Sequence, residues 1–164
     1  MSVKLIVAVR LFPDPAQEAA LRETVVLCNH AANYASARAF QTGITGKQSL
    51  QRLVYGDLKA MGLSAQPAIH VARKVAESYA ALRANIRAGS LGSLGSRRRQ
   101  HAESRPIRFR PDAAQPFDDR CLSWQLGART VASGPRGDVR AISHLHALPP
   151  NTPPWLPIAR ASRT

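Results

Sequence analysis

Residues 4–21 read KLIVAVRLFPDPAQEAAL, a short strand pattern that leads directly into a strong helix start. In its first half, apolar residues alternate with Lys4 and Arg10, as in a strand with one buried face and one basic face. Asp14 then offers a helix N-cap, followed by proline at the first helical position and by Gln17 at the capping-box position. A single strand is not stable alone, so its partners must come from later in the chain. We therefore expect the intervening residues to form an insertion.

Composition indicates a basic chain with one ordinary core. The 164 residues carry 23 Lys+Arg against 10 Asp+Glu, a formal net charge of +13. Such an excess predicts attraction to phosphate backbones or anionic membranes, and the alternative explanation is solubility alone. Cys28 and Cys121 lie far apart without a CxxC motif, which indicates neither a zinc site nor a disulfide framework. There is no signal-peptide pattern and no apolar run of membrane-spanning length. We expect a soluble cytoplasmic protein.

Three helices are predicted between residues 14 and 87. The first, over 14–41, has an apolar seam at steps of four and three formed by Leu21, Val25, Cys28, Ala32, Ala35 and Ala39. Asn29 and Asn33 lie one turn apart beside this seam, where solvated polar positions are favoured over a functional role. Gly62 is placed to stop a helix over 49–61, and Ser64 to cap one over 64–87. Short connections predict a small antiparallel bundle.

The second half of the chain reads as a linker, two strands and a tail. Residues 89–96, GSLGSLGS, have the composition of a flexible linker. Residues 106–110 (PIRFR) alternate as a strand with one basic face, and residues 120–125 (RCLSWQ) form another strand candidate. We expect both to pair with the first strand. Residues 132–164 contain six prolines, which predicts a segment that is disordered or merely draped over the rest.

No catalytic constellation is visible in the sequence. Asp118 and Asp119 are adjacent in a predicted turn, where bonding to nearby backbone is the common explanation. His144 and His146 resemble part of a metal site but have no nearby third ligand. The glycine-rich stretch lacks the ending of a phosphate-binding loop and follows a helix rather than a strand. We expect no catalytic residue, no metal, no cofactor and no small-molecule substrate.

Nucleic-acid binding is better supported. If the strands pair, the cations of the first strand, of PIRFR and of the linker would form one continuous positive surface. The third helix carries two further candidates. The predicted binding residues are Lys4, Arg10, Arg73, Lys74, Arg97, Arg98, Arg99, Arg108 and Arg110. Arginine forks suit phosphate oxygens, and such contacts position a protein without reading sequence. Phe109 and Trp124 could stack on bases, although their alternating positions favour a core role.

The chain resembles the N-terminal portion of TnpB-type proteins, the OrfB transposases of insertion sequences, which are RNA-guided DNA endonucleases. The similarity begins in KLIVAVRLFPDPAQEAALRETVVLCNHAANYAS, continues through LQRLVYGDLKAMGLSAQPAIHVARKVAESYAAL, and ends around RPIRFRPDAAQPFDDRCLSWQ. It covers residues 3–131. The order and spacing of these segments carry it.

The resemblance implies an α+β fold, in which a small wedge-type β-barrel or sheet is interrupted by a three-helix recognition lobe. Residues 1–12 would be the first strand, 13–90 the helical insertion, 91–131 the linker and return strands, and 132–164 a disordered or out-of-frame tail. The partners would be guide RNA and target DNA, with the protein reading shape while base pairing reads sequence. The family's RNase-H-like nuclease domain and zinc ribbon have no counterpart here, so we expect a truncated copy without enzymatic activity. Two alternatives stay open: a stand-alone basic RNA- or DNA-binding module, and a helical adaptor that docks a partner on the alanine-rich seam.

Overall fold

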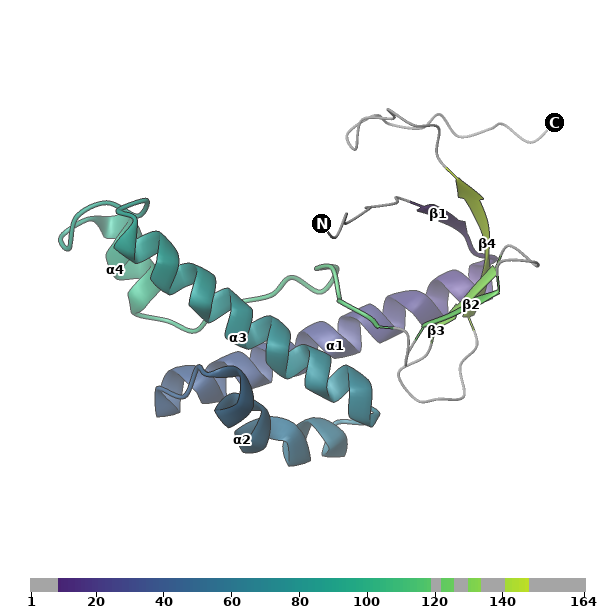
Figure 1. The fold of residues 1–164 in the computed structure, drawn as a ribbon, viewed down its shortest axis with the longest axis horizontal. Helices are drawn as coiled ribbons and strands as arrows, with labels where there is room; N and C mark the ends of the chain where they lie inside the picture. The colour runs from purple at the N-terminus through teal and green to yellow at the C-terminus, as the bar shows by residue number, and fades with distance from the viewer. Residues whose placement is uncertain (1–8, 119–121, 126–129, 134–140, 148–164) are drawn as a thin grey trace, which may run out of the picture.

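The computed structural model describes residues 9–118, 122–125, 130–133 and 141–147, and this part of the chain is mainly helical (Figure 1). Its elements in chain order are β1 (Val9–Phe12), α1 (Pro15–Thr42), α2 (Lys47–Ala60), α3 (Ala65–Arg87), α4 (Arg97–Glu103), β2 (Leu122–Gln125), β3 (Thr130–Ser133) and β4 (Ala141–Ala147). The three long helices predicted from the sequence are confirmed. None of the described helices is long and apolar enough to cross a membrane.

The predicted start of α1 is confirmed in detail. The Asp14 carboxylate accepts a hydrogen bond from the backbone N–H of Gln17 at 2.8 Å, and the Gln17 amide oxygen accepts from the N–H of Asp14 at 3.1 Å. This reciprocal capping box satisfies two backbone donors that a helix start otherwise leaves unpaired. The helix then runs for 28 residues and ends at Gly43, whose left-handed φ of 71° suits a residue without Cβ.

The next two helices follow with short connections. Gly62 adopts a φ of 95° after α2, as its predicted role as a stop requires. Ser64 occupies the N-cap of α3 as expected, although its side chain makes no capping hydrogen bond. The short turn between them brings α3 back across α1 and α2 (Figure 1).

The core lies where these three helices meet. From the alanine-rich seam of α1, Cys28, Ala32, Ala35 and Ala39 are fully buried, while Leu21 and Val25 near the start of the helix are half-buried. Facing them are the larger side chains of Leu50, Val54, Leu58, Leu63, Val71 and Val75, all in one apolar cluster. Small residues on one helix allow the backbone of another to approach closely, so the alanines receive the bulky residues of α2 and α3.

The strands form one small antiparallel sheet in the order β1-β4-β3-β2. Strand β1 pairs with β4, with Val9 opposite Ala147 and Phe12 opposite His144. Strand β4 also pairs with β3, which pairs with β2. The partner of the first strand therefore lies within residues 132–164, the region for which we predicted disorder.

The expected fold class is wrong. Instead of a wedge-type β-barrel with a helical insertion, the described residues form a helical body with a small open sheet at one end and no barrel (Figure 1). The predicted strand at 106–110 is absent as well. There, the backbone N–H and C=O of Phe109 bond to the side-chain amide of Asn33 instead of to a neighbouring strand. Because Pro106 and Pro111 lack N–H donors, the stretch between them is also poorly suited to a sheet.

Candidate nucleic-acid interface

Arginines gather at the end of α3 and in the residues that follow it. We call residues 83–105 the arginine arm, which comprises the last turns of α3, a connecting turn and α4 (Figure 1). It contains six arginines, at positions 83, 87, 97, 98, 99 and 105, and one acidic residue, Glu103. In Figure 1 the arm is at the opposite end of the molecule from the sheet.

Among the residues that the structure describes, most of these arginines have no acidic partner. The Arg99 Nε lies 3.1 Å from a carboxylate oxygen of Glu103, and the guanidinium of Arg83 donates to the Thr45 hydroxyl at 2.6 Å. The other four, Arg87, Arg97, Arg98 and Arg105, are exposed and have no hydrogen bond or ion pair from their side chains within the described part of the chain. Guanidinium groups that are free of internal partners can form forked contacts with phosphate oxygens.

The turn between α3 and α4, where the sequence predicts a flexible linker, has a hydrogen-bonded conformation in the structure. Gly89 and Gly92 adopt positive φ angles of 70° and 86°. The Ser96 hydroxyl donates to the carbonyl of Leu91 at 2.6 Å and accepts from the N–H of Arg99 at 3.3 Å, which caps α4. The glycines that indicated flexibility instead supply backbone conformations that other residues rarely adopt. Arg97 and Arg98 are thereby placed on a helix.

The structure does not bring the predicted binding residues into one surface. Arg108 and Arg110 are exposed but lie on irregular backbone, and Arg110 is 3.8 Å from Asp112. Arg73 is exposed in the middle of α3. Arg10 lies in β1 opposite His146, so strand pairing does not join it to 106–110, and Lys4 lies outside the described residues. Arg97 and Arg98 begin α4, and Arg87, which was not among the predicted residues, ends α3 on the other side of the same turn.

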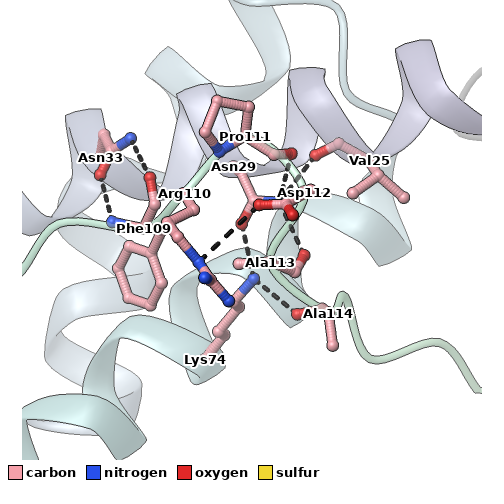
Figure 2. Close-up of polar contacts among 10 residues, drawn as sticks. All are labelled: Val25, Asn29, Asn33, Lys74, Phe109, Arg110, Pro111, Asp112, Ala113 and Ala114. Carbon is pink, nitrogen blue, oxygen red and sulfur yellow. Dashed lines mark hydrogen bonds and ion pairs between the residues drawn. The ribbon is translucent and has the colours of Figure 1, made fainter.

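Lys74 serves an internal network rather than the surface (Figure 2). Its ammonium donates to the Asn29 amide oxygen and to the Ala114 carbonyl, each at 2.7 Å, and lies 5.1 Å from the centre of the Phe109 ring. Burial lowers the pKa of this lysine below its usual 10.5. The predicted role of Phe109 in the core is confirmed, since its ring packs against the buried cluster.

Asn29 and Asn33 are structural residues, and our preferred interpretation of them as solvated positions is wrong. Both bind the return segment, which we define as residues 107–115 (Figure 2). The fully buried Asn29 amide donates to the carbonyls of Val25, Pro111 and Ala113 at 2.8–3.0 Å. Asn33 exchanges two hydrogen bonds with the Phe109 backbone. Two asparagines one turn apart beside an alanine seam were the available signal, but nothing local identified their partners.

Asp118 accepts a hydrogen bond from the Gln66 amide at 2.8 Å, and its carboxylate also lies 3.1 Å from the imidazole Nε2 of the buried His70. This arrangement attaches the chain after the return segment to the start of α3. Within the described ranges, no group of three or more His, Cys, Asp or Glu side chains could hold a metal ion.

Comparisons with protein-family models, curated proteins and solved structures found no significant match to this chain. A chemical role for the arginine arm can therefore be inferred only from the residues of the arm itself. Four exposed guanidiniums that have no partner among the residues described are suited to contacts with phosphate groups.

Proposed function

We propose that the chain binds nucleic acid through phosphate contacts of the arginine arm, as the N-terminal portion of a TnpB-like transposase whose partners are guide RNA and target DNA. The observation that carries the proposal is the uncompensated charge of the arm, where Glu103 is the single acidic residue beside six arginines. Binding of this kind fixes a nucleic acid in position and does not read its sequence. The family assignment is supported by the resemblance in residues 3–131, which includes all three long helices.

The first experiment measures how the dissociation constant changes with salt. The double variant Arg97→Gln/Arg98→Gln removes two exposed charges from the arm, and Arg52→Gln/Lys59→Gln removes two exposed charges from α2 as a matched control. Each lost phosphate contact lowers the slope of log K against log salt by about 0.7–0.9, so the arm variant, which loses two, is expected to lose about 1.4–1.8 units of slope. The α2 control is expected to keep the slope. Equal effects of the two variants would remove the arm from the interface.

The second experiment identifies the RNA that purifies with the full chain. A TnpB-like role predicts strong enrichment of RNA from the 3′ end of the element that encodes the chain. Recovery of RNA without any such enrichment would contradict the family assignment and favour a stand-alone basic module. The salt experiment does not depend on this outcome, because phosphate contacts are the same in both cases.

The helical adaptor has less support than nucleic-acid binding. Its docking face was the alanine-rich seam, and Cys28, Ala32, Ala35 and Ala39 are fully buried beneath the other helices. A partner could reach this seam only by displacing them. The adaptor also predicts weak salt dependence, whereas phosphate binding falls steeply with added salt.

A further inference from the structure

Leu94 is an apolar side chain held in water at the tip of the arginine arm. Its exposed fraction is 77%, whereas the other exposed large hydrophobic residues in the described ranges, Phe12, Val26 and Phe40, reach 40–44%. A single exposed leucine needs no explanation on an ordinary surface. The position of Leu94 is unusual because the adjoining helix ends, within seven residues on either side, carry no acidic residue and four arginines, Arg87, Arg97, Arg98 and Arg99.

The turn that carries Leu94 is held by hydrogen bonds within residues 89–96. The Gly92 N–H donates to the Gly89 carbonyl at 2.9 Å, and the Ser96 N–H donates to the Ser93 carbonyl at 3.0 Å. A Cβ on Gly92 would lie 2.8 Å from the Ser96 Oγ, so the turn closes tightly where the chain passes over itself. With the Ser96 hydroxyl bonded to the carbonyl of Leu91, Leu94 lies within a hydrogen-bonded loop. Its exposure is therefore a property of a defined conformation.

We propose that Leu94 is a wedge that inserts between stacked bases of a duplex held by the arginine arm; this inference rests on the proposed function. The flanking guanidiniums would hold the phosphates on either side of the step, and the leucine would replace part of the base–base contact. Proteins that bend DNA use single leucine, phenylalanine or isoleucine side chains in this way, at a cost of a few kcal/mol per unstacked step.

A lipid membrane is the other anionic surface with an apolar interior, and one leucine is too small for it. Burying a leucine side chain contributes about 1.5–3 kcal/mol, whereas stable attachment to a membrane requires a full acyl chain plus a second signal or a broad amphipathic face. In addition, no aromatic residue lies in the arm to anchor it at a membrane interface. A single base step, by contrast, is a target of the size of one side chain.

The test uses the full chain and a DNA duplex with one TA step, which is the easiest kind of step to unstack. The adenine of that step is replaced by 2-aminopurine, whose fluorescence rises when it is unstacked, and end-attached dyes report bending. With saturating wild-type protein we expect increased fluorescence and a shorter end-to-end distance. Leu94→Ser is expected to lose at least about half of the fluorescence rise, with a dissociation constant changed by less than about tenfold. Leu94→Met, which retains an apolar tip, is the control and is expected to keep the rise.

The results that would overturn the wedge differ from those that would overturn the proposed function. If the wild-type protein binds the duplex without a fluorescence rise, or if Leu94→Ser gives the same rise, the wedge is overturned and nucleic-acid binding stands. If the wild-type protein does not bind the duplex or a single-stranded RNA of equal length, the proposed function fails. Binding to anionic vesicles that Leu94→Ser abolishes would also overturn the wedge and assign the tip to membranes. Because Leu94 is exposed, both variants are expected to fold, which circular dichroism checks.

Discussion

Asn29 and Lys74 lie 45 residues apart and are joined by a 2.7 Å hydrogen bond from the lysine ammonium to the asparagine amide oxygen. The opposite end of the same amide donates to two carbonyls of the return segment. One buried side chain thus connects α1, α3 and a stretch of irregular backbone. Buried polar groups stabilise a fold only when all their hydrogen bonds are made, so removal of one member is costly for the others.

Replacing Asn29 by alanine is expected to lower the free energy of unfolding by about 2–4 kcal/mol. The substitution leaves the carbonyls of Pro111 and Ala113 without their donor and deprives the Lys74 ammonium of an acceptor. Urea unfolding followed by circular dichroism measures the loss. The matched control is Asn85→Ala, on the exposed face of α3, with an expected change within about 0.5 kcal/mol. Similar values for the two variants would contradict the network.

Substitutions of Lys74 and of its neighbour Arg73 are expected to differ in their effect on the stability of the fold. Lys74→Met removes internal hydrogen bonds and is expected to destabilise the fold by about 1–3 kcal/mol without changing the salt slope of nucleic-acid binding. Arg73→Gln removes an exposed charge and is expected to leave stability within about 0.5 kcal/mol. Paired unfolding and binding titrations measure both quantities. A reduced slope for Lys74→Met would show that its ammonium reaches phosphate after all.

The ionisation of Tyr34 makes the stability of the fold depend on pH in the alkaline range. Its hydroxyl donates to the Asp57 carboxylate at 2.7 Å, and this hydrogen bond, together with burial and the charge of Asp57, raises the pKa of Tyr34 above its usual 10.0. Since the folded state holds this proton more tightly than the unfolded state, the stabilisation is complete below pH 10 and is lost as pH rises through the folded pKa.

The difference in tyrosinate absorbance between wild type and Tyr34→Phe isolates this titration. Its midpoint is expected above pH 10.0 in the wild type and lower in Asp57→Ala, which removes both the acceptor and the charge. Tyr55→Phe, measured in the same way, is the control for other tyrosines. A Tyr34 midpoint that Asp57→Ala leaves unmoved would contradict the assigned cause.

Alanine substitutions at Gly92 and Gly95, two glycines of the turn before α4, are expected to have unequal effects on the stability of that turn. Gly92→Ala places a Cβ 2.8 Å from the Ser96 Oγ at a positive φ, so the turn must rearrange and the N-cap of α4 is disturbed. Gly95→Ala meets nothing within 4 Å and has no such constraint. Amide hydrogen exchange of residues 90–103 is therefore expected to accelerate about fivefold or more in Gly92→Ala, as for a local loss of about 1 kcal/mol, and to stay nearly unchanged in Gly95→Ala. Equal exchange in both variants would mean that the turn is not held as the structure indicates.

The parts of the fold that sequence reasoning found are those with local causes. The start of α1 depends on Asp14 and Gln17, three residues apart, and the end of α2 depends on the single residue Gly62. The helical seam of alanines also repeats within one element. Each of these patterns is complete within a few residues of the chain, so the sequence predicts it directly.

The parts that were missed depend on distant partners. Alternation in residues 106–110 correctly indicated that Ile107 and Phe109 pack inward, but their backbone partner is Asn33, 76 residues before Phe109, rather than a strand. The partner of β1 lies in a proline-rich region whose composition suggested disorder. At the tip, glycine-rich composition does not distinguish a flexible linker from a turn that needs positive φ angles, and the deciding contact is the Ser96 hydroxyl on Leu91.

The sequence separation between Asn29 and Ala113, 84 residues, has a consequence for biosynthesis. A ribosome adds about 5–20 residues per second, so the carbonyls that satisfy the Asn29 amide are made roughly 4–17 s after the asparagine itself. During that interval the nascent α1 must keep this amide hydrated, and the surface on which the return segment will lie stays open. The helical body therefore cannot be completed before residues 107–115 have been translated. Slow codons between α3 and that segment would lengthen the period in which the nascent chain is exposed to chaperones and proteases.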